Sequence, residues 1–189
     1  MTLAKKIDKK FTLKDYQSWL DDERWELING TAYNMTPAPS FKHQAIAGTM
    51  YRILGNKLSG KRCVVGIAPL DVVLSDHDVV QPDVIVVCDR KKITVANIQG
   101  APDLVVEVLS PSTALKDKRE KKALYEKYGV KEYVIIDPTE SYVERFILKD
   151  GVFGLPDILG PQEVLVLQSL EGLEVPLSEV FETEEGEKR

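Results

Sequence analysis

One acidic residue interrupts a very apolar segment of this chain. Glu107 lies in the run from Leu104 to Leu109, whose other members are all leucine or valine. A second apolar run, from Val84 to Val87, is preceded directly by Asp83. Short continuous apolar runs are typical of strands buried in a sheet. The sequence therefore predicts two core strands, each of which carries a carboxylate.

Such a pair of carboxylates needs a positive partner. An ionised carboxylate in a dry interior costs several kcal/mol unless a cation compensates it, and a shared lysine or a bound metal is the simplest candidate. Pro82 is compatible with a strand start, so Asp83 is expected at a strand end that faces a cleft. We interpret the pair as a site, and as a catalytic one. The alternatives are a strand-end cap for Asp83 and a buried salt bridge without metal for Glu107.

Length and composition indicate one soluble domain over residues 1–189. With 189 residues and 43% hydrophobic content, the chain can bury one sizeable core. No segment approaches the roughly 18 consecutive apolar residues of a membrane span, and Met1 to Lys10 lacks a signal-peptide core, so we expect a cytoplasmic protein without membrane contact. Cys63 and Cys88 stand isolated in the sequence, so we expect reduced, packed thiols.

The charge balance limits how this chain can bind nucleic acid. A net charge of −5 and a pI near 5.2 argue against a protein that coats nucleic acid through an overall positive potential. Any nucleic-acid binding must therefore use a local basic patch.

Turn and cap signals divide the chain into helices and strands. The turn Asn29-Gly30 predicts a β-hairpin between Trp25–Ile28 and Thr31–Met35, and Gly129 predicts the end of a charged helix. The expected helices cover about 12–22, 40–58 and 116–128, and the expected strands cover 63–68, 70–74, 83–87, 104–109, 132–137, 142–148, 152–155 and 163–167. Residues 182–189 are expected to form a frayed tail.

Lys121 occupies an unusual place on the charged helix. Counted at 100° per residue, it lies in the middle of the apolar stripe, close to Tyr125, whereas Lys118, Arg119 and Lys122 point away. Because this helix follows the strand of Glu107, Lys121 is expected to reach back to that carboxylate. The alternative is a snorkelling lysine whose amine escapes to solvent. Tyr125 is expected to pack, and the alternative is a polar role near Lys121. The cationic run of Lys116, Lys118, Arg119 and Lys122 is interpreted as a solvated face that would track phosphates beside a nuclease site.

These residues resemble a known family. The linked motifs are Gln81-Pro82-Asp83, Glu107-Val108-Leu109-Ser110-Pro111-Ser112, the spacing Asp117, Lys121, Tyr125, and the later stretches Gly129-Val130-Lys131-Glu132-Tyr133 and Ile136-Asp137-Pro138. Together they resemble the Uma-type family of restriction-endonuclease-like proteins, which is placed in the PD-(D/E)xK nuclease superfamily. The resemblance covers about residues 11–167.

The resemblance implies a fold and an activity. It implies an α/β fold with a mixed central sheet flanked by helices, to which the hairpin at 25–35 is added, and Mg²⁺- or Mn²⁺-dependent hydrolysis of DNA phosphodiester bonds. The sequence departs from the superfamily pattern at Leu109, where the motif lysine is expected. Lys121 is the proposed replacement, and Glu26 matches an additional upstream acid.

We assign roles on this basis. Asp83, Glu107 and the backbone carbonyl of Val108 offer the hard oxygen ligands that suit Mg²⁺ or Mn²⁺. Lys121 would orient the attacking water or stabilise charge on the phosphate. Glu26 would complete the metal shell or bind a second ion, and the alternative is a residue that only serves its hairpin. Substrate contacts are predicted for His43, Lys118 and Lys122.

A second reading stays open. A catalytically silent module that binds nucleic acid or protein could keep the same fold, with Lys121 and Glu107 as a structural ion pair. A homodimer is expected by analogy with nucleases that address two strands.

Overall fold

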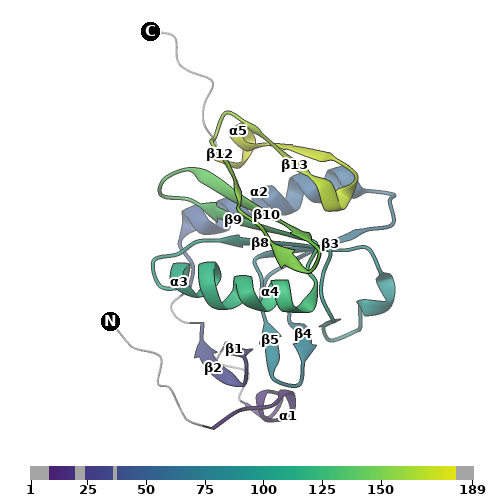
Figure 1. Ribbon diagram of the computed structural model, residues 1–189, viewed down its shortest axis with the longest axis vertical. Coiled ribbons are helices and arrows are strands. Elements are labelled where there is room, and N and C mark those ends of the chain that lie inside the picture. The colour runs from purple at the N-terminus through teal and green to yellow at the C-terminus, as the bar shows by residue number, and fades with distance from the viewer. Residues whose placement is uncertain (1–8, 20–23, 36–37, 182–189) are drawn as a thin grey trace.

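The computed structural model describes residues 9–19, 24–35 and 38–181. Its centre is a seven-stranded mixed sheet with the strand order β11-β10-β9-β8-β6-β3, in which β12 also pairs with β10 (Figure 1). The strands are β3 (Val64–Ile67), β6 (Val84–Val87), β8 (Leu104–Val108), β9 (Glu132–Asp137), β10 (Tyr142–Lys149), β11 (Val152–Phe153) and β12 (Asp157–Leu159). β8 and β9 run parallel, whereas β6 runs antiparallel to β8. The predicted mixed α/β sheet is confirmed.

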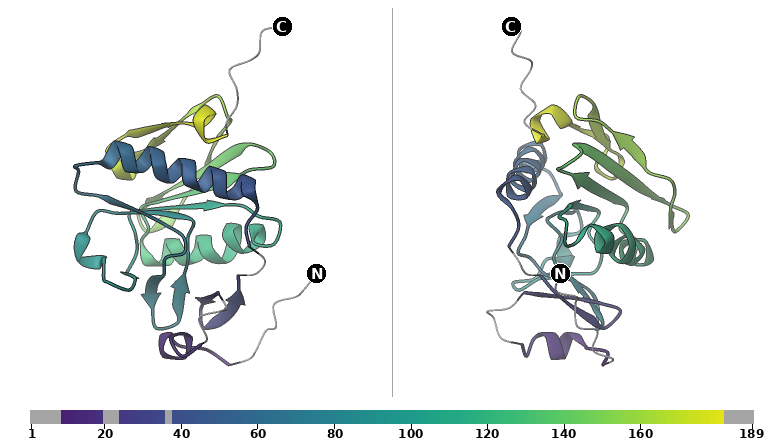
Figure 2. Two further views of the ribbon diagram at one scale, coloured as in Figure 1. Left: turned by 180° about the vertical axis from the view of Figure 1, so that it is seen from behind. Right: turned by 90° about the vertical axis from the view of Figure 1, so that its left-hand side faces the viewer.

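Helices cover both faces of this sheet. α2 (Phe41–Leu58) lies on one face and α4 (Lys122–Tyr128) on the other, as the side view shows (Figure 2). Neighbouring strand residues point to opposite faces, so Val84 and Val86 join the core under α2, whereas Ile85 and Val87 join the core under α4. β13 (Val164–Leu167), β14 (Leu173–Pro176) and α5 (Leu177–Val180) complete the α2 side. Both strand faces are therefore buried, which explains the continuous apolar runs of β6 and β8.

A second, five-stranded sheet packs below the first (Figure 1) and has the order β2-β1-β5-β4-β7. Its strands are β1 (Trp25–Ile28), β2 (Thr31–Asn34), β4 (Val72–Ser75), β5 (Asp78–Val80) and β7 (Ile98–Gln99). The predicted hairpin is confirmed, because Asn29 and Gly30 take the positive φ angles of 51° and 73°. This sheet matters for the site because it carries Glu26 on β1.

The structure corrects several predicted elements. The first helix, α1 (Leu13–Tyr16), is shorter than expected, and residues 20–23 of its predicted span lie outside the described residues, as does the predicted tail at 182–189. β5, β7, β12, β14, α5 and the 3₁₀ turns Arg90–Lys92 and Gln168–Leu170 were not predicted. The predicted helix at 116–128 is divided into α3 (Ala114–Lys116), a π-helical turn (Asp117–Lys121) and α4. In the described residues, no helix is long and apolar enough to cross a membrane.

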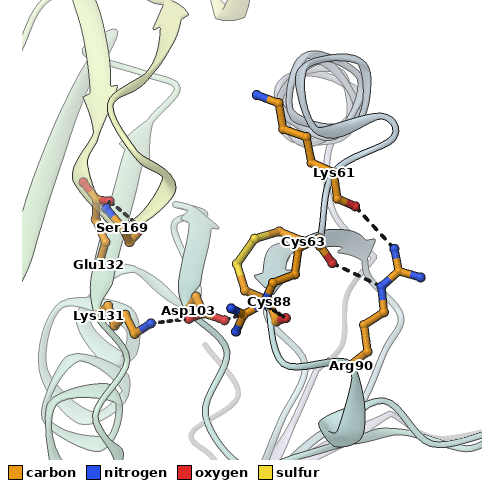
Figure 3. Close-up of a disulfide and its surroundings, with 9 residues drawn as sticks. Lys61, Cys63, Cys88, Arg90, Asp103, Lys131, Glu132 and Ser169 are labelled. Carbon is orange, nitrogen blue, oxygen red and sulfur yellow. Dashed lines mark hydrogen bonds and ion pairs between the residues drawn. A yellow bond between two sulfur atoms is a disulfide. The ribbon is translucent and has the colours of Figure 1, made fainter.

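The two cysteines are not free thiols, as the sequence had suggested. Cys63 and Cys88 form a disulfide with a Cα–Cα distance of 3.9 Å (Figure 3). The register of β3 and β6 pairs Val64 with Val87, so the next residues outward, Cys63 and Cys88, are brought opposite each other. Their separation of 25 residues hides this proximity, because it follows from strand pairing and not from a local motif.

One buried carboxylate ties the second sheet to the helical layer. Asp78 is 1% exposed and accepts hydrogen bonds from the Asn29 N–H at 2.6 Å, the Ser75 hydroxyl at 2.9 Å and the Tyr128 hydroxyl at 2.6 Å. Burial alone would raise the pKa of Asp78, but these hydrogen bonds lower it below its usual value. Asp78 thus fixes the hairpin that carries Glu26 against α4.

We predict that Asp78→Asn lowers the free energy of unfolding by about 1–3 kcal/mol at pH 7, because one of the two acceptor oxygens becomes an amide NH₂ that faces buried donors. A lowered folded-state pKa gives stability that is present above the unfolded value, near 3.9, and is lost as pH falls through the folded pKa. The difference between wild type and variant should therefore shrink below about pH 4. Urea unfolding at several pH values measures this difference, and a constant value from pH 7 to pH 3 would contradict the assignment.

Candidate active site

The two carboxylates of the buried strands face each other. β6 and β8 pair Val84 with Val106, and the same antiparallel register places Asp83 opposite Glu107. Asp83 Oδ2 accepts the backbone N–H of Val108 at 2.8 Å, which fixes the Asp83 side chain beside the end of β8. The Asp83 side chain is 17% exposed and that of Glu107 is 4% exposed. The pair therefore lies at the border between the core and the surface.

A buried lysine joins Glu107 to the second sheet. Lys121 Nζ lies 2.8 Å from Glu107 Oε1 and 2.8 Å from Glu26 Oε1, and the lysine side chain is only 3% exposed. Asp117 Oδ1 lies 3.6 Å from the same nitrogen and has no hydrogen-bond partner. The ammonium of Lys121 thus points at three carboxylates, and the snorkelling alternative does not describe it.

The remaining contacts of the two glutamates are also specific. Tyr125 donates its hydroxyl to Glu107 Oε1 at 2.7 Å, so this residue is more than a packing residue. Glu26 is fully buried, and its Oε1 also accepts the Gln81 N–H at 3.0 Å. Glu26 Oε2 accepts from Lys116 Nζ at 2.5 Å. Both oxygens of Glu26 are therefore occupied by protein donors.

The π-helical turn explains why two lysines reach one carboxylate. Lys116 and Lys121 are five residues apart, which would place them about 140° apart around an α-helix at 100° per residue. A π turn closes on its fifth residue and brings such positions close together. The turn at Asp117–Lys121 thus directs Lys116 inward, where its side chain is 12% exposed. The prediction that Lys116 belongs to a solvated face is wrong for this reason.

The cluster holds more carboxyl groups than ammonium groups. Asp83, Glu26, Glu107 and Asp117 lie around the ammonium groups of Lys121 and Lys116. Burial, and the nearby carboxylates, raise the pKa of Glu107 to about 8 in spite of the opposing charge of Lys121. Burial likewise raises the pKa of Asp117. For Glu26, burial is outweighed by the charges of Lys121 and Lys116, which lower its pKa to about 2. An additional cation beside Asp83 and Glu107 would relieve the imbalance.

His43 contacts this pair from the first turn of α2. Its Nε2 lies 3.2 Å from Asp83 Oδ2, whereas its Nδ1 is buried without a hydrogen-bond partner. Burial would lower the pKa of His43, but the hydrogen bond and charge of Asp83 and the backbone of Val108 raise it. His43 therefore lies beside Asp83 in the candidate site, and its contact with substrate stays a prediction.

The other two predicted substrate contacts lie elsewhere. Lys118 pairs with Glu144 at 2.6 Å, and Lys122 Nζ lies 4.3 Å from the centre of the Phe146 ring. Both lysines therefore pack against β10 and are not brought to Asp83. Sequence reasoning missed Lys116 because an α-helical count directs it to solvent. Asp117 was part of the quoted motif spacing, but its burial was not foreseen.

The oxygen ligands at the site fit a hard divalent cation that is coordinated by few protein groups. No three His, Cys, Asp or Glu side chains within 9–19, 24–35 and 38–181 are grouped so that they could hold one metal. Asp83 and Glu107 offer two carboxylates, and Val108 adds a carbonyl. Mg²⁺ commonly binds one or two carboxylates and keeps several waters. Glu26 does not fit this shell, because its oxygens are buried against lysines.

Removal of the buried ammonium of Lys121 should strongly destabilise the protein. Lys121→Met should lower the free energy of unfolding by about 3–5 kcal/mol, because it leaves buried carboxylates without their partner. Lys122→Met is the matched control, and we expect a loss below about 1 kcal/mol there because, within the described part of the chain, its ammonium contacts the Phe146 ring and no carboxylate. Urea denaturation followed by circular dichroism measures both values. Equal losses in the two variants would contradict the role of Lys121.

Comparison with known proteins places this site in a family. The family described as "Uma2: Putative restriction endonuclease" matches residues 13–178. The uncharacterized protein slr1290 of Synechocystis sp. (strain PCC 6803) is 28% identical over 145 residues, which cover 75% of this chain and 76% of that protein.

A solved structure shares the fold. The crystal structure of a putative nuclease belonging to DUF820 from Anabaena variabilis aligns with a TM-score of 0.75 and 21% identity, and the alignment covers 91% of this chain and 98% of that one. At this identity the likeness concerns the fold alone. Because the family match spans most of the chain and agrees with the motifs around Asp83 and Glu107, the protein belongs to the Uma2 family of putative restriction endonucleases.

Proposed function

We propose that this protein is a divalent-metal-dependent endonuclease that hydrolyses DNA phosphodiester bonds. The observation that carries this proposal is the pair Asp83 and Glu107, which lie opposite each other at the strand ends with the ammonium of Lys121 at 2.8 Å from Glu107. Family membership supports nucleic acid as the substrate, and restriction-endonuclease-like proteins generally use divalent metals.

The metal ligands in this proposal are Asp83, Glu107 and the carbonyl of Val108. The hydrogen bonds described for Asp83 fall on Oδ2 and those for Glu107 on Oε1. The second oxygen of each carboxylate is therefore the natural ligand. A bound Mg²⁺ would make its water more acidic and polarise the phosphate.

The protein residues around this pair orient it. Lys121 and Tyr125 fix the Glu107 carboxylate from one side, and His43 and the Val108 N–H fix Asp83 from the other. Glu26 acts as a positioning residue that holds Lys121, and we do not assign it to the metal. Lys121 in turn keeps a positive charge close to the site of phosphate attack, which would stabilise developing negative charge.

A second candidate function follows from how completely Lys121 is enclosed. Three carboxylates surround its ammonium and its side chain is 3% exposed, as in a purely structural ion pair. A catalytically silent module that binds nucleic acid or protein would show the same network. Metal binding and cleavage assays distinguish the two functions.

Asp83→Asn should reduce Mg²⁺- or Mn²⁺-dependent nicking of supercoiled DNA by about 100-fold or more, because even residues behind metal ligands contribute about 10- to 100-fold. The exposed Asp76 provides the matched control, and Asp76→Asn should cleave like wild type. Mn²⁺ should raise the melting temperature of wild type and of the control but not of Asp83→Asn, since a ligand of the folded state stabilises it.

Two results would overturn the proposal. Absence of cleavage by wild type on supercoiled, linear and branched DNA, together with an unchanged melting temperature in Mn²⁺, favours the silent module. An equal effect of Mn²⁺ on all three proteins removes Asp83 from the metal site.

A further inference from the structure

A dense group of cations lies at the end of α2 that is remote from the candidate active site. We call it the basic cap, and it consists of Lys57, Lys61, Arg62, Arg90, Lys91 and Lys92. The segments 57–62 and 89–92 contain these six positive residues and one acid, Asp89, although the whole chain has a net charge of −5. The basic cap is therefore a local reversal of the overall charge.

The fold holds the two segments of the basic cap together. Arg62 Nε donates to the Cys88 carbonyl at 2.8 Å, and Arg90 Nε donates to the Arg62 carbonyl at 3.1 Å. Arg90 also reaches the Lys61 carbonyl at 3.4 Å, and the disulfide between Cys63 and Cys88, which directly adjoin the two segments, links them covalently (Figure 3). The basic cap is thus an ordered surface and not a pair of unrelated loops.

In the described ranges, the exposed cations of the basic cap do not pair with carboxylates, whereas Lys92 is half-buried, donates to the Ala101 carbonyl at 2.7 Å and helps to lower the pKa of Asp103. Among the residues that the structure describes, none of its six members forms an ion pair, whereas Lys116, Lys118 and Lys131 all contact carboxylates at 2.5–2.6 Å. Asp89 accepts the backbone N–H of Lys91 at 3.1 Å. Lys57, Lys61, Arg62, Arg90 and Lys91 are exposed. Unpaired, exposed cations on an ordered surface are suited to phosphate groups.

The surface of α2 between the basic cap and the active site is also compatible with a polyanion, although the exposed Glu179 of α5 lies 3.8 Å from Arg52 there. α2 connects the two, with His43 in its first turn and Leu58 at its end, and its 18 residues include no aspartate or glutamate. Gly48 and Gly55 lie on its outer side, and a Cβ atom at either position would meet nothing within 4 Å. Packing within the protein therefore does not require glycine at these two positions. Each glycine lowers the stability of the helix by about 1 kcal/mol relative to alanine. A shallow hollow of about 370 Å³ lies beside Gly55, Lys61 and Arg90.

We propose that the basic cap is a second anchoring surface for duplex DNA, which contacts phosphates away from the bond that is cut. This inference rests on the proposed nuclease function. At 1.5 Å per residue α2 is about 27 Å long, which corresponds to about eight base pairs at 3.4 Å per pair. A duplex that reaches both the active site and the basic cap must therefore be longer than about eight base pairs.

Fluorescence anisotropy without divalent metal tests the proposal, because it reports binding and not cleavage. Wild type should bind a duplex of about 24 base pairs more tightly than one of about 8, which is too short to reach both surfaces. In the double variant Lys61→Glu/Lys91→Glu this gain in affinity with duplex length should disappear. The plot of log K against log salt concentration should become less steep by about 2, since each lost phosphate contact reduces the magnitude of its slope by about 1.

Lys14→Glu/Lys149→Glu is the matched control, because it changes the net charge equally at two exposed positions outside the basic cap. It should keep the gain with length and the salt slope. Equal behaviour of the two double variants, or no gain with length in wild type, would overturn the proposal. Tighter binding of wild type to anionic vesicles or to an RNA duplex of equal length would overturn the assignment to DNA. If the length effect is found but no metal supports cleavage, the basic cap stands and the nuclease function fails.

Discussion

The buried ammonium of Lys121 is the constraint on which the rest of the site depends. It lies 2.8 Å from Glu26 on the second sheet and 2.8 Å from Glu107 on the central sheet, so one side chain joins both sheets. A buried ion pair adds little net stability, but removal of one partner is costly. The network therefore fixes geometry more than it adds stability. It orients Glu107 beside Asp83, and it makes the relative position of the sheets a condition for an intact site.

The π-helical turn at Asp117–Lys121 makes this network of buried lysines and carboxylates possible. A regular α-helix would have turned Lys116 towards solvent and left Glu26 with one lysine. The turn brings both lysines to Glu26, and the carbonyl of Asp117, which accepts the Lys122 N–H, also accepts the Tyr133 hydroxyl at 3.1 Å. Such turns are rare and often lie at functional sites. Lys121, at the end of this turn, supplies the positive charge that the motif lysine would have placed at position 109, where this chain has leucine.

The sequence predicted the features that depend on local signals. Asn29-Gly30 specified the hairpin, and the apolar runs around Glu107 specified the buried strands and their acids. Features that depend on distant pairing were missed. The disulfide follows from the register of β3 and β6, and the two- and three-residue strands β7 and β5 are too short for a periodic signal. Lys116 was misplaced because the helical count assumes a regular helix, and the inward turn appears only in three dimensions.

In the proposed mechanism Asp83 and Glu107 are metal ligands, whereas Glu26 holds Lys121 in place. Anomalous scattering from crystals soaked in Mn²⁺ tests this division most directly. The account predicts one peak at about 2.1 Å from an oxygen of Asp83 and of Glu107, a distance typical of small hard divalent cations. Glu26 should still accept from Lys121. A peak bound to Glu26, or none at the Asp83 and Glu107 pair under conditions that support DNA cleavage, would contradict the account.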